Sequence, residues 1–396
     1  MARGLSSTDR KLTALIVGES SRASASESDD QYAASDKSAP VSRGPLWNVS
    51  VRPSLLLHPG SESRCRAASV PRRLRDAFAM TLRKHTAVVA VGGNSLIVDD
   101  QHQSIPDQVK AATITSHHVA DMVEAGWTVV LTHGNGPQVG FILRRSGIAK
   151  GVVPEVPVDY ADADTQGAIG YMFQRALYNE FRRRKLKRKV VAIVTQVLVD
   201  PDDSAFKTPT KPIGAHMTEE IAKSLAQDLG WTVQEDAGRG WRRVVASPMP
   251  REIVERDIIE GLIDLGYIVI ACGGGGIPVL RDRQGELQGL EAVIDKDFAS
   301  SLLARDIGAE LFVVSTGVEK VAINFGQANQ RWLERITLEE ARRHLAEGQF
   351  PKGSMGPKIE AIIAFLERGG SRALITNPPN LGRALSGATG THIVPG

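Results

Sequence analysis

The chain has 396 residues, 42% of them hydrophobic, and its 48 basic and 45 acidic side chains give a net charge of +3. This length and apolar content suffice for one large domain or two smaller ones with a proper core. Two cysteines, Cys65 and Cys272, exclude a disulfide framework and a cysteine-based zinc site, and favour a reducing, cytoplasmic compartment. The longest uncharged apolar stretch, 266–280, is too short for a membrane span, which takes about 20 residues.

Residues 1–84 differ in composition from the rest of the chain. They contain 14 Lys and Arg, 8 Asp and Glu, and 15 serines. Such a polar segment cannot bury enough surface to offset the entropy of ordering it, so we expect a disordered, basic, Ser- and Arg-rich N-terminal extension. Its acidic residues argue against a transit peptide, and Met80 is a candidate initiator. Residues 85–396 then form the folded domain, whose 34 basic and 37 acidic side chains give no electrostatic case for nucleic-acid binding.

From residue 85, short β-branched apolar runs alternate with amphipathic stretches. We expect strands at 86–93, 127–134, 190–200, 267–276, 310–317 and 372–377, and helices at 106–126, 165–184 and 250–266. The strand runs are continuously apolar, as is typical of strands buried on both faces. This order predicts a three-layer α/β/α sandwich with a mainly parallel central sheet. The stretch 201–247, rich in Pro, Gly and Trp, interrupts the rhythm, and we expect it to form a small protruding lid subdomain.

Three glycine clusters, at 92–94, 134–137 and 273–276, fall at the carboxyl ends of predicted strands. Ligands of open α/β sheets bind at these ends. Glycine lets the backbone approach an anion closely, and a following helix N-terminus adds N–H donors. One cluster alone is weak evidence, because tight strand–helix turns use glycine for steric reasons, but three predict phosphate binding. The P-loop, G-x-G-x-x-G, G-x-S-x-G and HExxH motifs are absent.

Phosphate loops that contain no lysine need cations from elsewhere. Lys211, Lys296 and Lys358 each lie among Gly, Pro or apolar residues, unlike the usual solvated surface lysine. Asp295 and Asp297 bracket Lys296, and a carboxylate there could hold a lysine in place or meet a magnesium ion. As a set, these residues predict a phosphoryl-transfer site.

A basic run, RRRKLKRK, occupies 182–189. It could be a nuclear-localisation or nucleic-acid patch. Because it falls at the end of a predicted helix, where cations complement the helix dipole, we interpret it as a solvated helix end.

Taken in order, the motifs resemble carbamate kinase, a member of the amino-acid kinase fold. The resemblance runs from about Val88 to the C-terminus and is carried by GGNSL, THGNGPQVG, QGAIGYMFQRAL, TPTKPIG, GRGWRR, ACGGGGIPV, IDKD and GSMGPK. Four places depart from the pattern of the family. Ser95 and Ala246 replace a usual Ala and Pro, 215–217 replaces an aromatic-containing run, and 158–164 is divergent.

The resemblance implies reversible, Mg²⁺-dependent phosphoryl transfer between ATP and carbamate, giving ADP and carbamoyl phosphate. It further implies operation toward ATP in the breakdown of arginine or related ureido compounds, and a homodimer. Transfer would be direct and in line, so that positioning and charge neutralisation do most of the work. Two alternatives remain: a kinase of this fold that acts on a different small acid, and a nucleotide-sensing protein without turnover.

The resemblance also assigns residues. Backbone N–H groups would hold the phosphate at Gly92, Gly93, Asn94, Gly134, Asn135 and Gly136. Lys211 would reach in from the lid, while Lys296 and Lys358 would neutralise the phosphates and Asp297 would orient the lysines. The nucleotide would contact Gly274, Gly275, Ser315, Thr316, Val321, Asn324, Met355 and Gly356. Magnesium would be held mainly by the nucleotide phosphates, without protein ligands.

Overall fold

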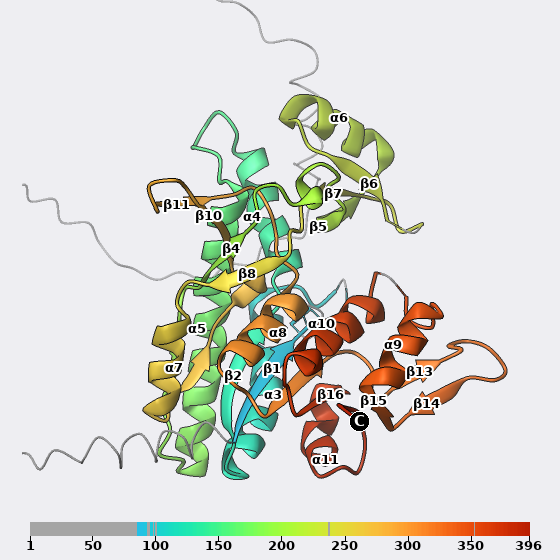
Figure 1. The fold of residues 1–396 in the computed structure, drawn as a ribbon. Coiled ribbons are helices and arrows are strands. Elements are labelled where there is room, and N and C mark those ends of the chain that lie inside the picture. The colour runs from blue at the N-terminus through green and yellow to red at the C-terminus, as the bar shows by residue number, and fades with distance from the viewer. Residues whose placement is uncertain (1–84, 93–95, 98, 100, 237, 352) are drawn as a thin grey trace, which may run out of the picture. The chain divides into compact units, whose positions relative to one another are not determined.

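The computed structural model describes residues 85–92, 96–97, 99, 101–236, 238–351 and 353–396. The expected disordered extension, 1–84, lies outside the described residues. An eight-stranded sheet forms the centre of the described part (Figure 1). Its strands lie in the order β15 (Arg335–Thr337), β17 (Thr391–Val394), β16 (Arg372–Thr376), β12 (Leu311–Ser315), β1 (Thr86–Val91), β2 (Thr128–His133), β9 (Ile268–Ile270) and β3 (Val190–Ala192). Within this sheet, β16 and β17 form the single antiparallel pair among the described strands, so the predicted mainly parallel sheet is confirmed.

Helices cover both faces of this sheet, which explains the continuously apolar strands. On β1, Val88 and Ala90 pack into one core, and Ala87, Val89 and Val91 pack into the other. The first core is closed by α7 (Arg256–Asp264), α8 (Lys296–Asp306), α9 (Leu338–Ala346) and α10 (Met355–Glu367). The second is closed by α3 (Ile105–Glu124), α5 (Val158–Arg184) and α11 (Leu381–Leu385). Because successive side chains of a strand point to opposite faces, every position of β1 is buried.

Three smaller sheets surround the central one. One is ordered β11 (Leu287–Gly289), β10 (Ile277–Arg281), β4 (Gln196–Val199) and β8 (Pro250–Ile253), and another pairs β13 (Val321–Ile323) with β14 (Arg331–Leu333). The stretch 201–247 contributes η2 (Ser204–Phe206), β5 (Lys211–Met217), α6 (Glu219–Leu229), β6 (Val233–Glu235) and β7 (Trp241–Val245). Its strands form a sheet of their own, in the order β5-β7-β6, at the top of the view in Figure 1. Segment 201–247 therefore contributes no strand to the central sheet.

Two predicted elements are wrong in their bounds. The run 190–200 forms two strands, β3 and β4, which belong to different sheets. The stretch 250–266 begins with strand β8, which pairs antiparallel with β4, and only then continues into α7. Helix α5 starts at Val158, so the divergent segment 158–164 forms its first turns. Among the helices that the structure describes, none combines the length and apolar character needed to cross a membrane.

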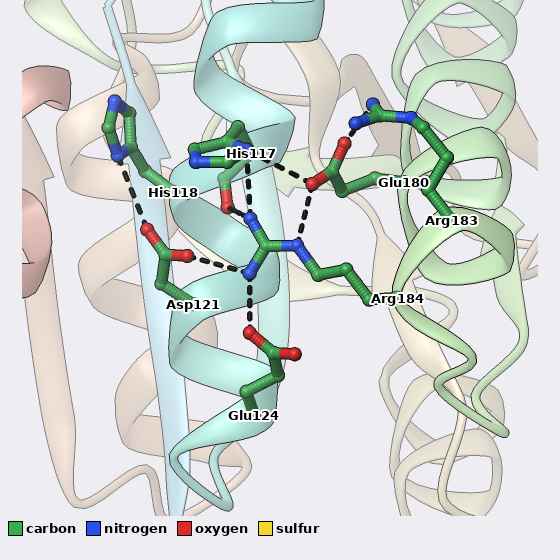
Figure 2. Close-up of polar contacts among 7 residues, drawn as sticks. All are labelled: His117, His118, Asp121, Glu124, Glu180, Arg183 and Arg184. Carbon is green, nitrogen blue, oxygen red and sulfur yellow. Dashed lines mark hydrogen bonds and ion pairs between the residues drawn. The ribbon is translucent and has the colours of Figure 1, made fainter.

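A network of charged side chains joins α3 to α5 (Figure 2). Arg184, the last residue of α5, donates to Glu180 at 2.6 Å, to Asp121 at 2.7 Å and to Glu124 at 2.6 Å. It also donates to the backbone carbonyl of His117 at 2.9 Å. Burial alone would lower the pKa of Arg184, but the three carboxylates raise it above its ordinary value. The interpretation of 182–189 as a solvated helix end is therefore wrong for Arg184, whose side chain is 13% exposed.

Replacing Arg184 by alanine should lower the free energy of unfolding by about 3 kcal/mol, because the buried Glu180 would lose its cation, while the partly exposed Asp121 and Glu124 contribute less. Urea unfolding followed by circular dichroism measures this change. Arg183→Ala is the matched control: Arg183 is next in the chain and contacts Glu180, but its side chain is 60% exposed, so the loss should stay within about 1 kcal/mol. Equal losses in the two variants would contradict a structural role for the network.

Candidate active site

Gly92 and Gly134, the residues that follow the paired strands β1 and β2, lie at the carboxyl edge of the central sheet. The backbone N–H of Gly92 donates to the carbonyl of Ser315 at 3.1 Å, and that of Gly134 donates to Val91 at 3.0 Å. These bonds continue the sheet beyond its strands and bring Gly92 and Gly134 close to the end of β12. They also engage the N–H groups of both glycines, which were predicted to hold the phosphate. Gly93 and Asn94, which were predicted for the same role, lie outside the described residues.

Helix α8 begins at this edge and carries two of the predicted charged residues. Nζ of Lys296 lies 2.5 Å from Oδ1 of Asp297, and Nζ of Lys358 lies 2.9 Å from Oδ2 of the same carboxylate. Lys358 belongs to the first turn of α10, which packs beside α8. The structure thus brings together three predicted residues that come from two helices.

Burial and neighbouring charges both shift the pKa values of Lys296 and Asp297. Burial would raise the pKa of Asp297, which is 3% exposed, but Lys296 and Lys358 more than offset this and hold the pKa well below its usual range. Burial likewise lowers the pKa of Lys296, with Lys358 acting in the same direction and Asp297 against it. The cluster carries two cations and one anion, and this excess positive charge favours a phosphate ligand.

Lys211 contacts the start of the same helix, α8. It is the first residue of β5, and its Nζ lies 2.5 Å from Oδ2 of Asp295. Asp295 is the N-cap of α8, and its Oδ1 accepts from the backbone N–H of Asp297 at 2.8 Å. Burial would raise the pKa of Asp295, but the Lys211 charge lowers it below its ordinary value. The sequence singled out Asp295 only as a carboxylate next to Lys296, and its contact with the distant Lys211 was not predicted.

A contact between two glycines fixes how β5 approaches the body of the protein. Helix α4 (Gly136–Ile148) passes so close to β5 that a Cβ added at Gly140 would lie 1.9 Å from Cα of Gly214. Gly214 also has a φ of 75°, which favours glycine. This close approach places Lys211, three residues earlier, over the N-terminus of α8.

The loop of four glycines, 273–276, contains η3 (Gly273–Gly275). It packs against the loop after β2, residues 134–136, which we call the second phosphate loop. A Cβ at Gly274 would lie 2.1 Å from Nδ2 of Asn135, and a Cβ at Gly275 would lie 2.3 Å from the carbonyl oxygen of Ile294. Packing therefore accounts for glycine at both positions. The structure places these two predicted nucleotide contacts beside Asn135 and the start of α8.

The other predicted nucleotide residues lie around the ends of β12 and β13. Val321 and Met355 line a cavity of about 150 Å³, and Phe325 and Trp332 are also among its lining residues. Thr316 lines a different cavity, of about 480 Å³. The remaining predicted residues are Ser315, buried at the end of β12, Asn324, whose φ is 53°, and Gly356, whose N–H donates to Pro351 at 2.9 Å.

Side chains that sequence reasoning did not select hold the second phosphate loop. The amide of Asn135 donates to Asp162 at 2.9 Å and to Thr165 at 2.8 Å, and all three residues are buried. Asp162 falls in the divergent segment 158–164, which was the only signal in the sequence. His133, at the end of β2, is buried beside this loop, and a Cβ added at Gly273 would lie 2.5 Å from its Nε2.

The buried His133 should make the stability of the protein depend on pH. Burial lowers the pKa of His133 to about 4, from 6.5 in an exposed residue. Between these values the unfolded chain binds a proton that the folded chain does not, so stability is lost as the pH falls through this window. The loss reaches about 3 kcal/mol at pH 4, from about 1.4 kcal/mol per pKa unit.

Chemical denaturation at several pH values tests this expectation. His133→Gln should flatten the dependence between pH 6.5 and 4, whereas the matched variant His102→Gln should leave it unchanged, since the His102 side chain is 57% exposed. A wild-type slope in His133→Gln would show that His133 does not contribute.

The carboxylates of the site are engaged by lysines rather than arranged for a metal. Both oxygens of Asp297 and one oxygen of Asp295 contact ammonium groups. Within the described part of the chain, no group of three His, Cys, Asp or Glu residues has the geometry to hold a metal ion. These residues do not fit a magnesium ion held by the protein alone.

Comparison with known proteins gives a consistent result. The family model described as "Amino acid kinase family" matches residues 85–377. The carbamate kinase of Thermococcus kodakarensis is 48% identical over 310 residues, which cover 78% of this chain and 98% of that protein. The carbamate kinase-like protein YahI of Escherichia coli is 49% identical over 314 residues, covering 78% and 99%. A solved carbamate kinase from Giardia lamblia bound to AMP-PNP has a TM-score of 0.74 and 42% identity, and covers 80% of this chain and 100% of that one.

Proposed function

The chain belongs to the amino acid kinase family, and from this premise we propose that it is a carbamate kinase. It transfers a phosphoryl group between ATP and carbamate, giving ADP and carbamoyl phosphate. The observation that carries the proposal is the Asp297 carboxylate, which is held between Lys296 and Lys358 at the carboxyl edge of the sheet. The choice of reaction is supported by relatives that are named carbamate kinase and are matched over nearly their whole length.

The two lysines of this cluster act on the charge of the transferring group. During in-line transfer, negative charge spreads over the equatorial oxygens and the leaving oxygen, and fixed cations in a water-poor place stabilise it. Asp297 holds both ammonium groups in position before substrates arrive. Their geometry therefore costs little reorganisation at the moment of transfer.

The acceptor end is formed by the phosphate loops and Lys211. The N–H groups of Gly92 and Gly134 are engaged by backbone carbonyls, so the amides of Asn135 and Gly136 at the start of α4 bind the phosphate of carbamoyl phosphate, aided by the helix dipole. Lys211 is delivered by the segment 201–247, which acts as the lid and closes over the acceptor. In our proposal the contact of Lys211 with Asp295 links this closure to the helix that carries Lys296.

The nucleotide lies toward the cavity of Val321 and Met355, whose aromatic neighbours suit an adenine ring. That the Giardia relative binds AMP-PNP supports a nucleotide site. Magnesium enters with the nucleotide as part of the substrate and neutralises its phosphates. We further propose a cytoplasmic homodimer that works toward ATP, as the sequence resemblance implies.

Formation of ATP from ADP, Mg²⁺ and carbamoyl phosphate, followed by luciferase luminescence, tests this function. Acetyl phosphate at the same concentration is the matched alternative donor. ATP from carbamoyl phosphate at a much higher rate supports the proposal. A preference for acetyl phosphate would point to a kinase for a different small acid. ADP binding in calorimetry without turnover of either donor would point to a nucleotide sensor.

A further inference from the structure

Helix α4 begins with a residue that does not cap it. Asn135 is the N-cap of α4, and asparagine in this position ordinarily accepts a hydrogen bond from an amide of the first turn. Here the Asn135 side chain makes no such bond. The first amide groups of α4 thus lack a side-chain cap, at the end of the helix where the dipole favours an anion.

The side chain of Asn135 is instead directed to α5. Its Nδ2 donates to Oδ1 of Asp162 at 2.9 Å and to Oγ1 of Thr165 at 2.8 Å. Oγ1 of Thr165 donates its own proton to the backbone carbonyl of Asp162 at 2.7 Å, which leaves the oxygen free to accept. Gly274 lies against the same amide, where any side chain would collide with it. Both hydrogens of the amide are therefore committed to α5, and the amide cannot turn without breaking two buried bonds.

The surroundings of Asp162 favour a neutral carboxylic acid as the partner of the Asn135 amide. It is 1% exposed, and its Oδ2 has no hydrogen-bond partner among the described residues. The groups that face it are the neutral Asn135 and Thr165 and the acidic Asp159, one turn earlier on α5. A charged carboxylate with a bare oxygen in such a place is very unfavourable. Burial, with Asp159, raises the pKa of Asp162 well above its ordinary value. A neutral Asp162 can accept from Asn135 without placing a negative charge beside the phosphate.

We propose that Asp162, supported by Thr165, is a positioning residue for the acceptor half of the reaction. It holds the side chain of Asn135 away from the N-terminus of α4, so that the amide groups there stay open to the phosphate of carbamoyl phosphate. This inference rests on the proposed function and adds two residues to it. Without Asp162, Asn135 turns back and caps its own helix, a contact worth about 1 kcal/mol that competes with the substrate.

Steady-state kinetics of Asp162→Ala in the full chain tests the proposal. The KM for carbamoyl phosphate should rise about fivefold or more, as expected from about 1 kcal/mol of competing capping, while kcat and the KM for ADP stay within twofold. Asp162→Asn retains an uncharged acceptor and should keep the wild-type KM within twofold. A purely structural residue would instead lower the melting temperature in both variants without a selective change in KM. An unchanged KM in Asp162→Ala overturns the proposal.

The double variant Asp162→Ala, Asn135→Ala gives the sharper result. It has no side chain left to cap α4, so its KM for carbamoyl phosphate should fall back toward the wild-type value. A KM equal to or above that of Asp162→Ala overturns the proposal. If Asp162→Ala does not fold, Thr165→Val removes one of the two bonds with little change in shape and should raise the same KM about two- to threefold. A Thr165→Val variant with wild-type KM then overturns it.

A direct binding measurement separates this inference from the reaction itself. If the unaltered chain forms no ATP, the proposed function fails, and calorimetric titration with inorganic phosphate still tests the positioning. Affinity for phosphate should be weaker in Asp162→Ala and recover in the double variant. Equal affinity in all three proteins, or no phosphate binding by the unaltered chain, overturns the inference.

Discussion

Replacing Lys296 by alanine is expected to lower kcat about 10²-fold or more, and Lys358→Ala is expected to do the same. The reason is that each ammonium group is fixed by one oxygen of Asp297, in a place where solvent screens little. Charge that develops during transfer would lose one of its two fixed cations. A factor of 10² corresponds to about 3 kcal/mol of barrier.

The kinetic loss must be separated from a loss of structure. Lys223→Ala is the matched surface control, because this lysine pairs with Glu219 on α6 and its side chain is 65% exposed. It should leave kcat unchanged. Thermal unfolding of all three variants should show that they remain folded. Turnover near the wild-type rate in Lys296→Ala or Lys358→Ala would remove that lysine from the mechanism.

The central sheet could be predicted because its physical cause is local. A strand that is buried on both faces must be apolar at every position, and β1 shows this in six consecutive buried residues. The charged cluster was predictable for a related reason. A lysine such as Lys358 in GSMGPK follows a run of glycine, proline and apolar residues rather than the charged residues that mark a solvated helix face.

The break within 190–200 depends on contacts that no local pattern contains. Thr195 separates β3 from β4, and its backbone N–H and carbonyl are both satisfied by the side chain of Gln166, at 2.8 and 3.1 Å. Its hydroxyl accepts from the backbone N–H of Cys272 at 3.0 Å. These partners lie 29 and 77 residues away in the chain. An apolar run can be recognised locally, but the point where it leaves a sheet is set by such distant groups.

The partner of Asp295 and the role of Asp162 were missed for the same reason. The contact between Lys211 and Asp295 spans 84 residues, and that between Asn135 and Asp162 spans 27. A carboxylate beside a lysine in the sequence can also be a helix cap, and Asp295 is both a cap and a partner of a distant lysine. The sequence pattern predicts that acidic residues belong near the site, but only the fold determines which cation each one meets.

Replacing Lys211 by alanine is expected to separate the two substrates. Lys211 begins β5, outside the central sheet, and precedes Pro212, which stiffens the backbone and restricts where the ammonium can point. A cation that closes over the acceptor matters after the nucleotide has bound. ADP affinity, measured by calorimetry, should therefore stay within about threefold, while kcat/KM for carbamoyl phosphate falls at least about 10²-fold.

Lys211→Arg should restore little, because a planar guanidinium cannot replace a compact ammonium group in a closed pocket. The contact with Asp295 adds a necessary control, since removing Lys211 leaves that largely buried carboxylate without its cation. Asparagine also caps helices well, so the double variant Lys211→Ala, Asp295→Asn removes the stray charge while keeping the start of α8 intact. If the double variant remains about 10² below the wild type, the lost cation is the cause. Recovery in the double variant would assign the defect to the unpaired charge of Asp295. A collapse of ADP binding in Lys211→Ala would place Lys211 on the nucleotide side of the site.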